Sequence, residues 1–158
     1  MPSLACIALG SNLGDRQGTL EGAIAALSGT RGVVVRKVSS FHETEPVGGP
    51  PDQGPFLNAA AVLETTLDPF GLLHVLQAIE TRFGRTRSVR WGERTLDLDL
   101  LLFDEQIVTT AELAIPHPRM ATRRFVLEPL AEIAPDVVDP VSHQTIAALL
   151  AALEGTPG

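Results

Sequence analysis

Cysteine and lysine are almost absent from this chain of 158 residues, and each shortage excludes a class of site. The one cysteine, Cys6, leaves no partner for an internal disulfide and excludes a cysteine-rich metal site. The one lysine, Lys37, does not close a G-x-x-x-x-G-K sequence, so a P-loop is excluded. Any phosphate that this protein binds must therefore be held by arginine.

Long apolar runs and a secretion signal are also missing. No window reaches the roughly 18 apolar residues of a membrane helix, and the N-terminus lacks a basic region followed by a long apolar stretch. Cys6 lies within the apolar run 4–9, where we expect a small core side chain rather than a reactive thiol. These features predict a soluble cytoplasmic protein with no membrane contact, and a monomer is the default expectation.

The charge of the chain is acidic but uneven. There are 19 acids against 12 bases, a net charge of −7, which argues against nucleic-acid binding. Residues 82–124 nevertheless hold eight bases and six acids. Five of these bases lie within thirteen residues: Arg82, Arg85, Arg87, Arg90 and Arg94. With 44% apolar residues, the chain 1–158 is predicted to form a single domain.

Hydrophobic periodicity along the chain predicts an α+β fold. Apolar and β-branched runs indicate strands at 4–9, 33–41, 56–67 and 96–103. Helical spacing indicates helices at 15–27, 68–83 and 145–153, with a shorter helical pattern inside 115–132. The Pro- and Gly-rich segment 46–55 and the Arg-rich segment 84–94 are predicted loops. This order favours a ferredoxin-like βαββαβ core with a mostly antiparallel sheet.

Asp97 and Asp99 are the strongest local signal. Residues two apart on a strand share a face, so both carboxylates project together, about 6–7 Å apart, while the flanking leucines face the other way. Such a pair repels, and a divalent cation removes the repulsion; Mg²⁺ prefers one or two carboxylates with phosphate oxygens and water. The alternative is the solvated face of an amphipathic strand.

The arginines before this strand suit a bound polyphosphate, because guanidinium groups pair with phosphate oxygens and stay charged. Ordinary Arg–Asp surface pairs are the alternative. Gln77 and Glu80 lie on one face of the predicted helix, opposite its leucine stripe, where they suit either a nucleobase edge or solvent. His117, between two prolines, suits a phosphate contact or an exposed loop. His42, His74 and His143 have no spacing partners, so the sequence assigns them no role.

A slot for a flat ring is a further expectation. Phe56, Trp91 and Phe125 offer aromatic faces, and Asn58 offers both a donor and an acceptor beside the segment 44–47. Core packing is the alternative for Phe56 and Phe125.

These motifs together resemble one family. The sequence RWGERTLDLDLL, residues 90–101, is similar to the signature of the 6-hydroxymethyl-7,8-dihydropterin pyrophosphokinase family of folate biosynthesis. The resemblance is collinear from about residue 5 to residue 150, and it includes five further blocks. These are ALGSNLGD at 8–15, SSF to TEP at 39–46, FLNAA at 56–60, IPHP at 115–118 and RRFVLEPL at 123–130.

The resemblance implies an α+β fold with helices on both faces of the sheet and a transferase that moves the β,γ-diphosphate of ATP to a pterin hydroxymethyl group, releasing AMP. It implies that Asp97 and Asp99 hold two Mg²⁺ ions and that Arg85 and Arg94 stabilise the transferring charge. The implied ATP contacts are Gln77, Glu80, Arg87, Trp91, Arg94, Leu100, His117 and Arg123. The implied pterin contacts are Thr44, Val47, Phe56, Asn58, Trp91 and Phe125.

The chain departs from the family pattern at three points. The segment between Arg87 and Arg90 is short, Phe56 stands where a tyrosine is frequent, and Glu112 lies near a position that is basic in some members. Two other functions remain open from the residues alone. A ferredoxin-like sheet suits an RNA-binding module, although no aromatic-rich strand supports that use. Asp97 and Asp99 also suit a metal-dependent phosphohydrolase.

Overall fold

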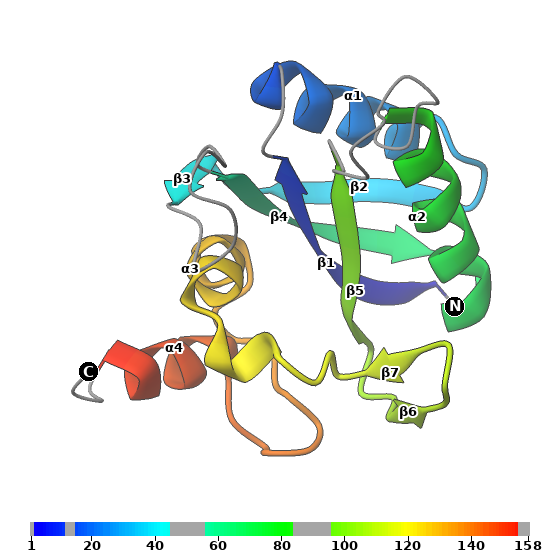
Figure 1. Ribbon diagram of the computed structural model, residues 1–158. Coiled ribbons are helices and arrows are strands. Elements are labelled where there is room, and N and C mark those ends of the chain that lie inside the picture. The colour runs from blue at the N-terminus through cyan, green and yellow to red at the C-terminus, as the bar shows by residue number, and fades with distance from the viewer. Residues whose placement is uncertain (1, 12–14, 45–55, 84–95, 155–158) are drawn as a thin grey trace.

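A computed structural model describes residues 2–11, 15–44, 56–83 and 96–154 (Figure 1). Its larger elements follow the predicted order: β1 (Ser3–Ser11), α1 (Arg16–Ser28), β2 (Val33–Val38), β3 (His42–Thr44), β4 (Phe56–Thr65), α2 (Pro69–Phe83) and β5 (Asp97–Phe103). The smaller elements that follow are β6 (Val108–Thr109), β7 (Ala114–Ile115), a 3-10 turn (Met120–Thr122), α3 (Arg124–Ile133) and α4 (Ile146–Glu154).

The main sheet has the strand order β2-β4-β1-β5, with β3 paired to β4 beyond the end of β2. Each neighbouring pair is antiparallel. The α1 connection carries the chain from β1 across β4 to β2, and the α2 connection carries it from β4 across β1 to β5. These two interleaved crossovers form the ferredoxin-like βαββαβ core, so the predicted fold class is confirmed.

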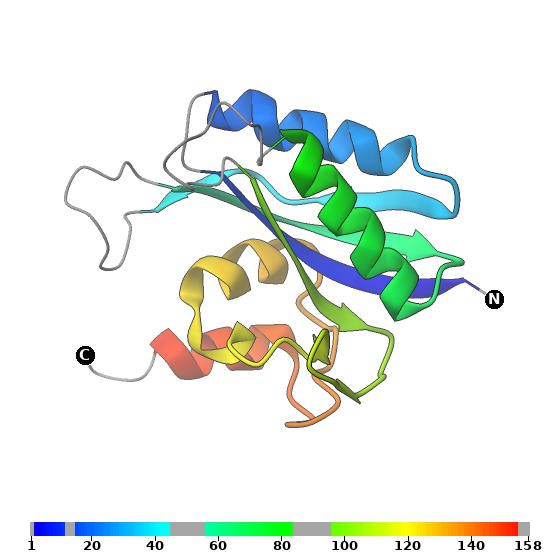
Figure 2. The ribbon, with the colours of Figure 1, turned by 45° about the vertical axis from the view of Figure 1, so that its right-hand side comes forward.

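Helices cover both faces of the sheet, as the family resemblance implied. Figure 2 shows α1 and α2 on one face and α3 and α4 on the other. Side chains along β1 point alternately to the two faces of the sheet and so contribute to both hydrophobic cores. Ile7 and Leu9 pack under α1 and α2, while Cys6 packs under α3 and α4. Burial raises the pKa of the Cys6 thiol to about 12, as expected for a core side chain.

Two aspartates fix where the long helices begin. The Asp15 side chain accepts a hydrogen bond from the Gly18 N–H at 3.0 Å, and the Asp68 side chain accepts one from the Gly71 N–H at 2.7 Å. Each bond satisfies a backbone donor that has no partner inside the helix. Pro69 occupies the first position of α2, where its missing N–H has no cost. The sequence placed both helix starts correctly to within one residue.

The strands differ from the sequence expectation at several points, and the strand expected at 56–67 ends at Thr65. β1 continues to Ser11, past the expected end at Leu9, because Gly10 is still paired on both sides, with Asn58 and with Asp97. The strand expected at 33–41 ends at Val38, where Ser39 Oγ accepts a hydrogen bond from the Ala60 N–H, and the next strand begins only at His42. The short β6–β7 hairpin has too few residues for a periodic signal.

Within the described part of the chain, no helix has both the length and the apolar character required to cross a membrane.

Candidate functional site

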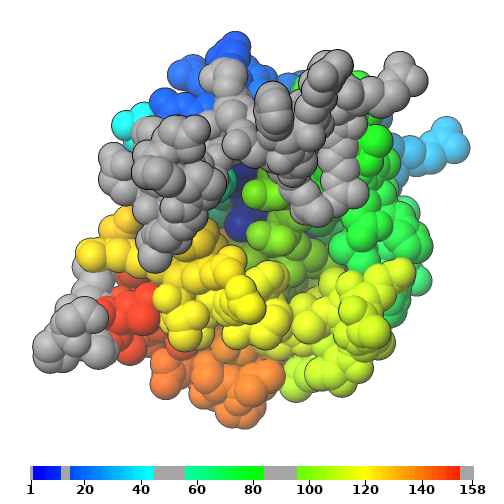
Figure 3. Space-filling model, in the orientation of Figure 1, coloured from blue at the N-terminus to red at the C-terminus, as the bar shows by residue number. Residues whose placement is uncertain are grey.

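A pocket of about 620 Å³ opens where β1, β3, β4 and β5 meet the start of α3. Seven of the residues that the sequence singled out line it: Thr44, Phe56, Asn58, Asp97, Asp99, Arg123 and Phe125. Figure 3 shows a hollow in this part of the molecule, with atoms of β1 and β5 at its floor. The fold therefore brings these seven residues to one pocket although they lie up to 81 positions apart in the chain.

The two carboxylates of the pocket come from β5. Asp97 and Asp99 are half-buried and share the face that looks into the pocket, while Leu98 lies in the opposite core at 5% exposure. Their partners across the ladder are Gly10 and Ala8, which are small enough to leave space in front of the acids. The predicted alternation of this strand is confirmed.

The donor set fits a divalent cation that shares its ligands with a phosphate substrate. Two carboxylates from one strand supply the one or two protein ligands that Mg²⁺ requires when phosphate oxygens and water complete its shell. Among the described residues, no cluster of three or more His, Cys, Asp or Glu side chains exists to hold a metal by itself. The pocket therefore suits a metal that arrives with a polyphosphate better than an all-protein metal cage.

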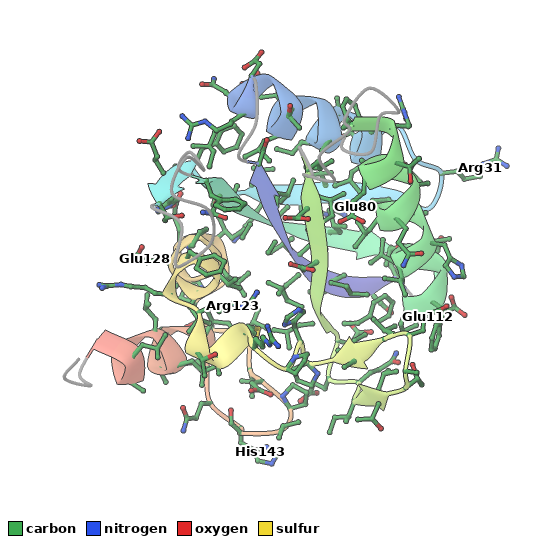
Figure 4. All side chains as sticks on the ribbon, viewed as in Figure 1. Arg31, Glu80, Glu112, Arg123, Glu128 and His143 are labelled. Carbon is green, nitrogen blue, oxygen red and sulfur yellow. The ribbon has the colours of Figure 1, made fainter. Side chains whose placement is uncertain are left out.

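Glu80 lies differently from the expectation. It was expected on the face of α2 opposite the leucines, but its side chain is buried at 8% exposure between α2 and β5 (Figure 4). There Glu80 Oε2 accepts a hydrogen bond from the Leu98 N–H at 2.8 Å. Gln77 is exposed as expected. The Leu100 side chain is buried in the core under α1 and α2.

His117 is half-buried and held on both sides by the backbone. The backbone N–H of His117 donates to the carbonyl of Leu101 at 3.0 Å, and the ring Nδ1 of His117 accepts from the backbone N–H of Arg119 at 3.2 Å. Burial lowers the pKa of His117, and the positive charges of Arg123 and Arg119 lower it further, although the Asp99 carboxylate opposes them. A neutral ring that accepts at Nδ1 carries its proton on Nε2, which makes that nitrogen a hydrogen-bond donor.

The start of α3 supplies a cation and an aromatic ring to the pocket. The Arg123 guanidinium lies over the Phe125 ring, 5.6 Å from its centroid, and Figure 4 shows Arg123 on the side of α3 that faces β5. Across the pocket, Asn58 is only 6% exposed, and its Nδ2 donates to Thr44 Oγ1 at 2.6 Å. This bond ties β3 to β4 at the pocket wall.

Five of the expected site residues lie outside the described residues: Val47, Arg85, Arg87, Trp91 and Arg94. Other residues line the pocket without having been assigned a role there: Ala8, Leu9, Gly10, Thr122, Arg124 and Val126. The two-residue period of a strand could have predicted that Ala8 and Gly10 line the pocket together, because they share a face of β1. His42, to which the sequence assigned nothing, contacts Glu132 on α3. No spacing rule could have identified that pair, because 90 positions separate the two residues.

Comparison with known proteins gives one consistent result. The family model described as 7,8-dihydro-6-hydroxymethylpterin-pyrophosphokinase (HPPK) matches residues 6–135. A Bacillus subtilis protein named 2-amino-4-hydroxy-6-hydroxymethyldihydropteridine pyrophosphokinase is 54% identical over 137 residues, which are 87% of this chain and 81% of the relative. A Methylorubrum extorquens protein of the same name is 43% identical and is matched over 95% of this chain and 93% of its own length.

Solved structures agree on the fold. The crystal structure of a Plasmodium falciparum HPPK-DHPS triple mutant superposes with a TM-score of 0.76 at 15% identity, and it covers 96% of this chain. This chain spans 43% of that longer polypeptide. At such low identity the similarity shows the fold alone.

Proposed function

Because this chain belongs to the 7,8-dihydro-6-hydroxymethylpterin-pyrophosphokinase family, we propose that the pocket between β5, β3 and α3 is the site of its reaction. The chain is an ATP-dependent pyrophosphokinase that transfers a diphosphate to hydroxymethyldihydropterin in folate biosynthesis. The observation that carries the assignment of the site is that one pocket joins two carboxylates to an aromatic and amide-lined wall.

The pterin lies, in this proposal, in a slot with Thr44, Phe56 and Asn58 on one wall and Phe125 on the other, and Val47 and Trp91 complete the slot. The rings of Phe56 and Phe125 offer flat faces for stacking. The Asn58 side chain is fixed by its bond to Thr44, which leaves Oδ1 to accept a hydrogen bond from the pterin. Since Phe56 has no hydroxyl, it contributes its ring alone.

ATP lies on the other side of the two acids. We propose Gln77, Glu80, Arg87, Trp91, Arg94, Leu100, His117 and Arg123 as its contacts, with Leu100 contributing its backbone because its side chain is buried in the core. His117 is suited to this role because a neutral imidazole with its proton on Nε2 can donate to a phosphate oxygen. The burial of Glu80 limits its part to the edge of the nucleotide site, since one of its oxygens already holds β5.

The chain's own groups align the reactants and neutralise charge. The pterin hydroxyl attacks the β-phosphorus of ATP and AMP leaves, a displacement that needs positioning and charge stabilisation more than a strong base. Asp97 and Asp99 would hold two Mg²⁺ ions, which when bound neutralise the phosphate oxygens. Arg85 and Arg94 stabilise the diphosphate as it transfers, and Arg123 adds a positive charge at the pocket wall.

Residues 1–158 act as one pyrophosphokinase domain that works as a monomer. The reaction takes place in the cytoplasm, where ATP is available. The protein binds ATP and hydroxymethyldihydropterin, with no part for nucleic acid or membrane.

The experiment that tests the proposed function follows AMP release with ATP, Mg²⁺ and 6-hydroxymethyl-7,8-dihydropterin. We expect one AMP for each pterin diphosphate formed and no AMP when the pterin is omitted. Release of phosphate or pyrophosphate into water without a pterin product would instead identify a phosphohydrolase and overturn the proposal.

A further inference from the structure

We propose that Glu132 is a positioning residue that fixes the distance between the two walls of the pterin slot, although it lies outside the pocket itself. The inference rests on the slot assigned above. It concerns the cluster of Ser40, His42 and Glu132, which we call the Glu132 clasp.

The clasp joins the segment before β3 to the end of α3 through one carboxylate. Glu132 Oε2 accepts from the Ser40 N–H at 2.7 Å, and Glu132 Oε1 accepts from the Ser40 hydroxyl, also at 2.7 Å. The same Oε1 lies 2.9 Å from His42 Nε2. These contacts join residues that are 90 to 92 positions apart. Lys37 Nζ reaches the Ile133 carbonyl at 3.4 Å beside the clasp, so the chain is held to α3 at two adjacent points.

Each side of the clasp continues into one wall of the slot. His42 begins β3, whose register pairs His42 with Asn58 and Thr44 with Phe56, so the position of β3 sets the Thr44–Asn58 bond. On the other side, Phe125 and Glu132 are seven residues apart on α3, which places them on the same helix face two turns from each other. The carboxylate thus ties together the elements that carry Thr44 and Phe125.

The size of β3 makes this tie important. β3 has three residues, and its ladder with β4 is its backbone support. A carboxylate that accepts several hydrogen bonds makes contacts roughly twice as strong as neutral ones. The hydrogen bonds from the Ser40 N–H, the His42 ring and the Ser40 hydroxyl lower the pKa of Glu132 to about 2, so it stays ionised wherever the enzyme works.

The clasp is not a catalytic triad. In a triad the histidine contacts the serine through one ring nitrogen and the acid through the other. Here His42 uses Nε2 toward both partners, and the Ser40 hydroxyl donates directly to the carboxylate. A mechanical role in holding β3 against α3 accounts for this geometry.

The test compares Michaelis constants for the two substrates. Glu132→Ala removes every contact that the carboxylate makes in the clasp, and Glu132→Gln keeps a carbonyl oxygen that accepts one of these hydrogen bonds. We expect Glu132→Ala to raise the KM for the pterin about tenfold and Glu132→Gln about threefold, with kcat and the KM for ATP changed less than about twofold. Asp136→Ala is the matched control, because it removes an equal charge from an exposed position four residues further along and should leave both constants at their wild-type values.

Asn58→Ala separates the two proposals. If Asn58→Ala leaves the KM for the pterin unchanged, the slot itself is misassigned and the clasp inference is overturned with it. If Asn58→Ala raises that constant but neither Glu132 variant does, the slot stands and the clasp inference is wrong. Equal increases in both Michaelis constants would also overturn it, because a general loss of stability does not distinguish the substrates. Should Glu132→Ala fail to fold, Glu132→Gln and Ser40→Ala decide the question.

Discussion

Glu80 and Leu98 connect α2 to the strand that carries both acids of the pocket, through a hydrogen bond of 2.8 Å from the Leu98 N–H to Glu80 Oε2. Leu98 stands between Asp97 and Asp99, so its backbone sets the height of the two acids above the sheet. A side chain on α2 therefore positions groups on the opposite face of β5.

Replacing Glu80 should reduce stability. Glu80→Ala leaves the buried Leu98 N–H without its acceptor, and an unsatisfied buried donor costs about 1–3 kcal/mol in the free energy of unfolding. Glu80→Gln keeps an acceptor and should lose less. Urea unfolding followed by circular dichroism measures both, with Gln77→Ala as an exposed control on the same helix. A Glu80→Ala protein as stable as wild type would show that the bond is dispensable.

Replacing either acid should remove activity and leave the fold intact. Asp97→Asn and Asp99→Asn keep the side-chain volume but remove the charge that would hold the metal, so we expect turnover to fall by about 10²–10³-fold. The melting temperature should change little, since both side chains are half-buried at the pocket and outside the core. Asp136→Asn controls for the loss of one negative charge. Retained AMP release in both variants would contradict the metal assignment.

Gly10 forms part of the pocket floor, and its lack of a side chain is required there. A Cβ at this position would lie 3.2 Å from Asn58 Oδ1, which is tighter than ordinary contact and would push the amide away from Thr44. We expect Gly10→Ala to raise the KM for the pterin about threefold to tenfold with no matching change for ATP. Gly29→Ala is the control, because its new Cβ would meet backbone atoms at 3.6 Å or more. If Gly10→Ala keeps the wild-type KM for the pterin, the position of the Asn58 amide does not matter for pterin recognition.

The sequence predicted the features that depend on local chemistry. The helix starts near Asp15 and Asp68 were predicted to within one residue, and in the structure each aspartate side chain accepts a capping hydrogen bond there. The paired acids of β5 follow from the two-residue period of a strand. These signals are contained in a few neighbouring residues, so no knowledge of the tertiary structure was needed.

The features that the sequence did not predict depend on contacts between distant segments. Glu80 is buried because β5 offers it a backbone donor, which the helical pattern of α2 does not contain. His42 has a partner because the fold brings Glu132, which follows it by 90 residues in the sequence, next to its ring. The end of β1 was placed too early because the pairing of Gly10 on both sides overrides the tendency of glycine to end strands.

The Glu132 clasp should also give the protein a measurable acid sensitivity. Its hydrogen bonds lower the pKa of Glu132 from 4.5 to about 2, so the folded state holds the ionised carboxylate more firmly than the unfolded chain does. The resulting stabilisation is fully present above about pH 5 and is lost as the pH falls from about 4.5 toward 2. In Glu132→Gln this contribution is absent at every pH. We therefore expect the difference in unfolding free energy between wild type and Glu132→Gln to be constant from pH 5 to 6 and to shrink steadily below pH 4.5, as followed by urea unfolding at each pH. Asp136→Asn is the control, and its unfolding free energy should not converge with that of wild type in this way. If the unfolding free energy of wild type instead runs parallel to that of Glu132→Gln down to pH 2.5, the clasp does not hold the carboxylate in solution.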